Sequence, residues 1–176
     1  MQTNIDSSST DVLETNSCLR IVPEAAALKI RALDGKRNLY NADKVFTGHR
    51  SGNLKIRGLD RPGNPTPEIE VSAYELADDS GFSGMFNAFK KPLAEVCLTQ
   101  DQISEICSVY PEHLNPIDLT FALFRRNENL PAIGANLFVA CISVTKNGPA
   151  VHDEKYHDDF IWYGNRELRI FVPRQA

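Results

Sequence analysis

The clearest pattern in the chain is an alternation of apolar and charged residues that occurs twice, as LKIRALD at residues 28–34 and LKIRGLD at residues 54–60. In each copy Leu and Ile fall on one side of an extended strand, while Lys and Arg fall on the other. Gly58 argues against a helix in the second copy, since glycine costs about 1 kcal/mol relative to alanine inside a helix. The pattern therefore predicts a strand at each copy.

Each copy is predicted to belong to a hairpin. The turn-rich RPGNPTP at 61–67 follows the second copy and leads into another alternating stretch, EIEVSAYEL at 68–76. For the first copy, a helix that begins at Pro23 and ends at Gly35 is the competing interpretation, and a run of alanines favours it. The hypothesis is two related hairpins, with helix or strand over residues 24–33 left open.

One helix is predicted from its own start signal. In TQDQISEICSVY (99–110), Thr99 stands where a helix cap is expected and Gln102 follows three residues later, as in a capping box. Apolar residues recur at helical spacing behind this start. A shorter helix is predicted over SGMFNAFKK (83–91), and a strand over LAEVCL (93–98).

The last third of the chain is rich in strand-forming residues. LTFALFRRN (119–127) and NLFVACISVTKNG (136–148) are predicted strands, the second ending in a Lys-Asn-Gly turn. FIWYGNRELRIFV (160–172) is predicted to be a hairpin closed by a two-residue Gly-Asn loop. The resulting fold class is α+β, a mainly antiparallel β-sheet of several hairpins with one main α-helix near residues 99–110.

The chain is expected to form one folded unit behind a short tail. Residues 1–18 are polar and offer little apolar surface, so they are predicted to be flexible. No Pro/Gly/Ser-rich linker divides residues 19–176, which are expected to form a single globular β-rich domain. The N-terminus lacks the basic and apolar segments of a secretory signal, and the four cysteines form no CxxC pair. These features favour a cytoplasmic protein with reduced thiols.

Charge is unevenly distributed, although the chain as a whole carries only −4. Residues 20–67 hold ten basic residues against four acidic ones, whereas residues 68–120 hold two lysines against ten acidic residues. The simplest interpretation is that the two segments neutralise each other or are solvated. The functional interpretation is a basic stripe that contacts an acidic partner or a phosphate backbone. Its candidate residues are Lys29, Arg31, Lys36, Arg37, Arg50, Lys55, Arg57 and Arg61.

The predicted C-terminal hairpin adds a second candidate contact surface. Trp162 and Tyr163 are adjacent, so they face opposite sides of a strand and one of them is expected to be exposed. An exposed aromatic side chain beside Arg166 and Arg169 has the composition of an interface anchor. The alternative interpretation is a strand buried on both faces.

The densest polar cluster is VHDEKYHDDF at 151–160, in which His152, His157 and Asp158 are candidate metal ligands. The two histidines lack the H-E-x-x-H spacing, and an extended strand would place them on opposite sides. A solvated loop is therefore the favoured interpretation. The segments GFSG and SVTK are near misses of nucleophile motifs, and no Gly-rich phosphate-binding motif occurs. No catalytic residue and no cofactor are predicted.

Taken together, these patterns predict a non-catalytic accessory or regulatory protein that binds another protein through its basic and aromatic hairpins. Direct nucleic-acid binding by residues 28–61 is the alternative, and a metal-dependent hydrolase centred on residues 152–159 is the third hypothesis. The complementary charged segments also allow salt-sensitive self-association. No membrane contact is expected, because the longest apolar run, LFVACISV, is far shorter than the ~20 residues of a spanning helix.

Overall fold

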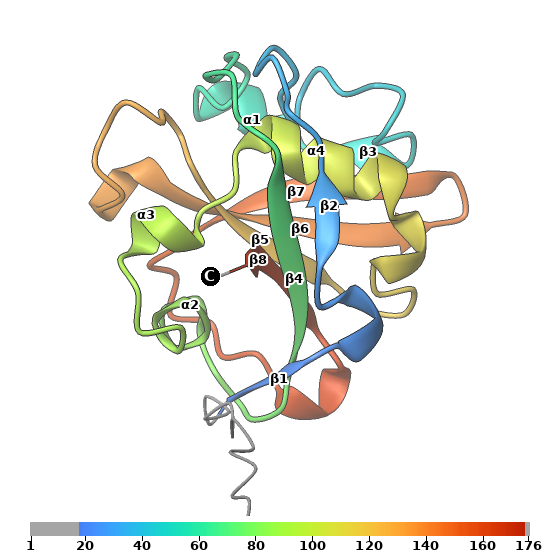
Figure 1. Cartoon of the computed structure of the whole chain (residues 1–176), viewed down its shortest axis with the longest axis vertical. Coiled ribbons are helices and arrows are strands. Elements are labelled where there is room, and N and C mark those ends of the chain that lie inside the picture. The colour runs from blue at the N-terminus through green and yellow to red at the C-terminus, as the bar shows by residue number, and fades with distance from the viewer. Residues whose placement is uncertain (1–17, 175–176) are drawn as a thin grey trace, which may run out of the picture.

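The structure is a computed structural model that describes residues 18–174 (Figure 1). Its strands are β1 (Leu19–Ile21), β2 (Leu28–Ile30), β3 (His49–Arg50), β4 (Ile69–Leu76), β5 (Thr120–Arg125), β6 (Leu137–Thr145), β7 (Gly148–Lys155) and β8 (Arg169–Pro173). Its α-helices are α1 (Asn53–Ile56), α2 (Phe82–Asn87), α3 (Leu93–Val96) and α4 (Gln100–Val109). Single turns of 3₁₀ helix are η1 (Pro23–Ala25), η2 (Pro111–His113), η3 (Gly134–Asn136) and η4 (Gly164–Arg166).

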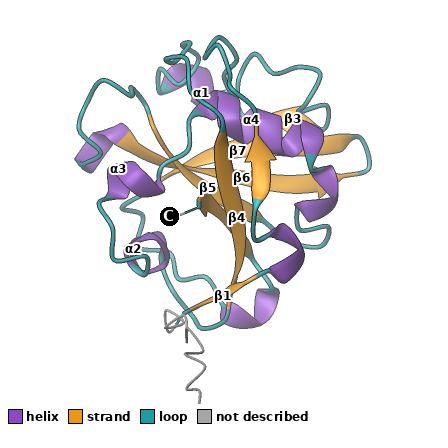
Figure 2. Cartoon of the chain, in the orientation of Figure 1, coloured by secondary structure: helices purple, strands orange, loops and turns teal. Residues whose placement is uncertain are grey.

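The strands, coloured orange in Figure 2, form one sheet in the order β1-β4-β8-β5-β6-β7-β3, and β2 pairs with β4 next to β1. Most pairs are antiparallel, but β5 and β8 run parallel, as do β3 and β7. The chain is therefore α+β as expected, although the sheet is mixed and not purely antiparallel. After the β6–β7 hairpin the chain returns to the end of the sheet where β5 began, so β8 starts beside Thr120 and runs in the same direction.

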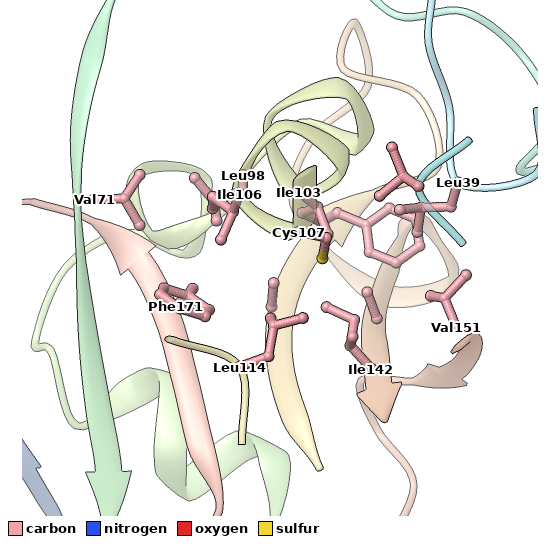
Figure 3. Packing of buried hydrophobic residues seen from close by; sticks show 14 of the residues in the cluster. Leu39, Val71, Leu98, Ile103, Ile106, Cys107, Leu114, Ile142, Val151 and Phe171 are labelled. Atoms are coloured by element: carbon pink, nitrogen blue, oxygen red, sulfur yellow. The ribbon is translucent and has the colours of Figure 1, made fainter. Parts of the chain in front are cut away.

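The sheet is covered on both faces. Successive residues of β5 alternate between two hydrophobic clusters, Phe121 and Leu123 in one and Ala122 and Phe124 in the other. Helix α4 packs on the Phe124 side, whereas α2 and α3 pack on the Phe121 side. In Figure 3 the apolar side chains of α4 point toward the sheet. Burial on both faces explains why the central strands are continuous apolar runs.

The predicted start of the main helix is confirmed. Thr99 Oγ1 accepts a hydrogen bond from the Gln102 backbone N–H at 3.2 Å, and Gln102 Oε1 accepts one from the Thr99 backbone N–H at 2.9 Å. This reciprocal pair satisfies two donors that a helix N-terminus otherwise leaves open. The predicted helix over 83–91 also exists, as the shorter α2.

The prediction of a strand at LKIRGLD is wrong, because residues 53–56 form helix α1. Gly58 does not interrupt the helix; it ends the helix, with φ at +69°. The N–H of Gly58 donates to the Lys55 carbonyl and the N–H of Leu59 donates to the Leu54 carbonyl, as in a Schellman motif. The glycine was thus a helix-stop signal at C′, where its lack of a side chain makes positive φ inexpensive.

The two predicted hairpins are also wrong, although one strand of each exists. LKIRALD does begin with a strand, β2, in which Leu28 and Ile30 are buried and Lys29 is exposed. That strand pairs with Ile69–Val71 of β4 and not with a neighbour across its own turn. The 68–76 stretch is β4, whose partners are β1, β2 and β8.

Three further expectations along the chain are corrected. LAEVCL contains helix α3, because Leu93 and Val96, three residues apart, turn toward the core while the residues between them are exposed. Residues 151–155, predicted as a loop, belong to β7, which pairs with β6 across the confirmed Lys-Asn-Gly turn. Phe160–Tyr163 forms no strand of a hairpin; within it only Trp162 makes a bridge, to Ser80. The chain instead forms η4 at Gly164, where an added side chain would lie 2.6 Å from the Ala77 backbone.

Two features concern the ends and the environment of the chain. The flexible tail predicted over residues 1–18 lies, apart from Cys18, outside the described residues. Between residues 18 and 174, none of the helices has the length and apolar composition needed to cross a membrane.

Candidate anion-binding pocket

Most of the predicted basic stripe is neutralised inside the fold. Arg37 binds Asp101 at 2.8 Å and Glu105 at 2.6 Å, and Arg31 binds the other oxygen of Glu105 at 2.7 Å. Both acidic partners lie on α4 and are almost completely buried. Burial raises the pKa of the Glu105 carboxyl, but hydrogen bonds from Arg31 and Arg37 outweigh the burial and leave this pKa below its ordinary value.

Other members of the predicted sites have carboxylate partners as well. The pairs are Lys36 with Asp34, Arg50 with Asp43, Arg57 with Asp153, Arg166 with Asp118, and Arg169 with Glu75. Within residues 18–174, the stripe residues that make no ion pair are Lys29, Lys55 and Arg61. The stripe therefore does not present a continuous row of free cations.

Three of the predicted residues instead converge on a cavity of about 410 Å³. Arg37 comes from the loop after β2, Arg57 from the end of α1, and Arg61 from the loop that follows. The start of α4 and the segment 125–130 after β5 complete the wall, and α1 and the start of α4 lie close together in Figure 1. The charged and amide side chains of the wall include Arg37, Arg57, Arg61, Gln100, Asp101, Arg125, Arg126, Asn127 and Glu128.

The cavity carries more positive than negative charge. The charges of Arg31 and Arg37 together balance those of Asp101 and Glu105, and the charge of Arg57 balances that of Asp153. Within the described chain Arg61, Arg125 and Arg126 have no carboxylate partner, and Glu128 makes no ion pair. Three unbalanced guanidiniums against one carboxylate leave an excess of two positive charges at the cavity.

Two close loop contacts give the cavity its shape. The N–H of Gly35 donates to Asp101 Oδ2 at 3.1 Å, and its carbonyl accepts from the Gly63 N–H at 2.8 Å. A side chain at Gly35 would clash with the Asn64 carbonyl oxygen, so only glycine lets the two loops approach this closely. On the far side Glu128 Oε2 accepts from the Asn64 N–H at 2.7 Å, which fixes the 125–130 segment against the same loop.

Two amide side chains of the wall, those of Gln100 and Asn127, use their oxygens as acceptors. Gln100 Oε1 accepts the Leu39 backbone N–H at 3.2 Å, and Asn127 Oδ1 accepts the Asn129 backbone N–H at 2.9 Å. Because a backbone N–H fixes each oxygen, the NH₂ group of each amide remains to donate. Together with the arginines, these groups make the wall a surface of hydrogen-bond donors.

Two arginines of the wall, Arg125 and Arg126, are held without a carboxylate. The guanidinium of Arg126 lies 5.2 Å from the centre of the Phe138 ring. Arg125 donates from Nη1 to the Leu130 carbonyl at 3.2 Å, while its Nε is buried without a partner. An uncompensated, half-buried cation is costly, so an anion in the cavity would stabilise it.

The aromatic segment lies apart from this cavity. Trp162 is half-buried, with its ring 4.8 Å from that of Phe121 and 5.6 Å from that of Phe82. Tyr163 is 54% exposed, so the two neighbours do face in opposite directions, although not in a hairpin. Arg166 holds Asp118 with two hydrogen bonds of 2.6 Å, and its guanidinium lies 5.8 Å from the Trp162 ring centre. Arg169 donates to the His113 carbonyl.

The His/Asp cluster is dispersed by strand β7. His152 Nε2 lies 3.8 Å from Glu154 Oε1, and the His157 ring packs edge-on against the Tyr156 ring. The Asp158 carboxylate accepts a hydrogen bond from the Lys155 backbone N–H. Within residues 18–174, no group of three or more His, Cys, Asp or Glu side chains is arranged to hold a metal ion.

The cysteine thiols are poorly disposed to act as nucleophiles. Burial raises the pKa of Cys107 and of Cys97 to about 12, and burial also raises that of Cys141 well above its ordinary value. A thiol reacts as its thiolate, which is scarce at such a pKa. These cysteines therefore serve as core side chains.

Sequence reasoning missed Arg125, Arg126, Gln100 and Asn127. The Arg-Arg-Asn run stands where a predicted strand ends, a place where side chains often leave the sheet for a binding loop. Nothing in the local pattern of Gln100 marks it, since it lies inside a capping box that is fully explained by the helix. The convergence depends on segments far apart in the sequence.

Compared with known proteins, the chain matches no family model, no curated protein sequence and no solved structure.

Proposed function

We propose that this chain is a non-catalytic accessory protein that binds another protein by holding an anionic group of that partner in the arginine cavity. The observation that carries the proposal is the excess of two positive charges at the cavity, on Arg61, Arg125 and Arg126, while most of the other cations of the stripe are paired. Guanidinium groups suit such a role because they remain charged and offer planar, forked donors to oxyanions.

A nucleic-acid strand is the weaker proposal for the same region. A phosphate backbone needs a row of free cations along its path, whereas Arg31, Lys36 and Arg50 are already engaged with carboxylates. Of the two aromatic side chains in this segment that could stack on a base, Phe46 is 2% exposed, which leaves Tyr40, at 36% exposed, as a single platform. A compact anionic group on a protein requires neither feature.

Fluorescence anisotropy with labelled peptides and oligonucleotides tests the proposal. We expect a Glu-rich peptide to bind at low salt, to lose affinity when both Arg61 and Arg126 are replaced by Gln, and to be unaffected by Lys55→Gln. Lys55 is the matched control, because it is an exposed cation beside the cavity that does not line it. Equal weakening by the control, or no anion binding at all, would reject the cavity as the site.

The same assay with single- and double-stranded DNA and RNA tests the alternative. Tight binding with a steep dependence on salt, insensitive to the two cavity substitutions, would move the proposal to a nucleic-acid surface elsewhere on the chain.

A further inference from the structure

We infer that the anionic group held in the cavity is a phosphate monoester, carried by a phosphorylated Ser, Thr or Tyr side chain of the partner protein. This inference rests on the proposed function and specifies its ligand. Three features support it: the size of the charge excess, the several segments that supply hydrogen-bond donors, and the small number of unpaired cations beyond the cavity.

The charge excess matches a dianion. Balancing each ion pair leaves Arg61, Arg125 and Arg126 opposed by Glu128 alone. A phosphate monoester carries about −1.5 to −2 at neutral pH, whereas a carboxylate carries −1. A phosphorylated side chain would thus neutralise the cavity, while an Asp or Glu side chain would leave it positive.

The hydrogen-bonding groups also fit a phosphate better than a carboxylate. Guanidiniums reach the cavity from two segments, the 61–64 loop and the end of β5, and the free NH₂ groups of Gln100 and Asn127 add donors from two more places. A phosphate monoester offers three strong acceptor oxygens in a tetrahedral arrangement, so donors from several directions can all be used. A carboxylate has two coplanar oxygens and is matched by one forked arginine.

The unbalanced guanidiniums gather at the cavity and form no long row, which favours a single group on a protein over a polyanion. Of the neighbouring stripe cations, Arg31 is neutralised by Glu105 and Lys36 by Asp34, while Lys55 makes no ion pair within the described chain. The 125–136 segment beside the cavity instead exposes apolar side chains, with Leu130 49% and Ile133 69% exposed. Residues flanking a phosphorylated side chain can pack on such apolar surface, whereas a phosphate backbone gains nothing from it.

The test is a titration of ¹⁵N-labelled protein followed by ¹H–¹⁵N correlation spectra that include Arg Nε–H and Asn/Gln NH₂ signals. The probes are capped peptides Gly-Gly-X-Gly-Gly in which X is phosphoserine, phosphotyrosine, Glu or Ser. Adenosine 5′-monophosphate and a 5′-phosphorylated oligouridine serve as non-peptide phosphates. We expect a phosphopeptide to shift the signals of Gln100, Asn127 and Arg126 saturably, and to bind about tenfold or more tightly than the Glu peptide.

Substitutions of opposite sign make the result specific. Arg61→Gln and Arg126→Gln should each weaken phosphopeptide binding about tenfold, while the control Lys55→Gln should not. Glu128→Gln should strengthen it about fivefold, because a like charge is removed while an oxygen remains for the Asn64 N–H. A site that was merely damaged by substitution would not bind more tightly.

The outcomes separate this inference from the function on which it rests. Equal binding of the Glu peptide and both phosphopeptides would overturn the phosphate assignment but leave protein binding through the cavity in place. Tighter binding of the nucleotide or the oligonucleotide would overturn the assignment to a phosphorylated protein. Absence of binding by every probe would overturn both proposals.

Discussion

Arg57 donates from Nη1 to two atoms of Asp153, to the carboxylate Oδ2 at 2.6 Å and to the backbone oxygen at 3.1 Å. The Asp153 side chain is fully buried in β7, while Arg57 stands at the end of α1. Strand β3 covers only Ala150 and Val151 of β7, so Arg57 satisfies a carbonyl that β3 does not reach. Arg57, which belongs to the LKIRGLD stretch predicted to be a strand, thus satisfies a backbone acceptor of β7.

Removing Arg57 should strongly destabilise the fold, since it leaves a buried carboxylate without its cation. We expect Arg57→Met to lower the free energy of unfolding by about 3 kcal/mol, measured by urea denaturation. Lys55→Met in the same helix should change it by less than about 0.5 kcal/mol, because Lys55 is exposed and makes no ion pair. Similar losses in the two variants would mean that the ion pair is not responsible.

Gly58 should be required for its backbone conformation and not for space. Nothing lies within 4 Å of a side chain added at Gly58, but its φ is +69°. Gly58→Ala should therefore lower the free energy of unfolding by about 1–2 kcal/mol through strain alone. Gly52→Ala is the matched control, because that position is equally open and has a φ of −61°. Thermal or urea unfolding of the two variants checks the difference, and equal stability of the two would contradict it.

The Arg31–Glu105–Arg37 cluster should make stability depend on acid pH. The pKa of Glu105 in the folded protein lies below its ordinary value of 4.5. Its contribution is therefore fully present above pH 4.5 and is lost as the pH falls through the lower, folded-state pKa. Glu105→Gln should cost about 1–2 kcal/mol near neutrality, discounted because Arg31 is largely exposed.

Urea denaturation of the wild type and of this variant at several pH values checks the sign. The difference in unfolding free energy should shrink as the pH is lowered below 4.5. A difference that stays constant with pH would show that the loss comes from packing and not from the charge.

The buried thiols should be protected in the native state. Because the pKa of Cys107 and of Cys97 is about 12, a chromogenic disulfide reagent near pH 8 should modify both slowly in the folded protein and rapidly after denaturation. Partial burial also raises the pKa of Cys18. Because Cys18 is partly exposed, it should still be the first of the described thiols to react. Mass spectrometry of the modified protein identifies the order. Rapid modification of Cys107 without denaturation would contradict its burial.

The candidate site was only partly predictable. The clustering of basic residues in segment 20–67 pointed to Arg37, Arg57 and Arg61, and all three reach the cavity. The same clustering pointed equally to Arg31, which is paired with Glu105 from α4, and to Arg50, which is paired with Asp43 of its own segment. The positions of basic residues in the sequence do not show which of them lack a carboxylate partner, because that depends on where the folded chain places the acidic side chains.

Local signals alone determined part of this protein. The capping box at Thr99 and Gln102 and the apolar run of β6 each reflect short-range chemistry, a reciprocal hydrogen bond and burial on both faces. Tertiary structure decided that two nearly identical heptapeptides adopt different secondary structures. Leu28–Ile30 is a strand paired with β4, while Asn53–Ile56 is a helix. That helix is terminated at Gly58, where the first copy has Ala32. It also decided the cavity, because five arginines from separate segments meet only once the loops after β2, α1 and β5 have been brought together by the sheet and α4.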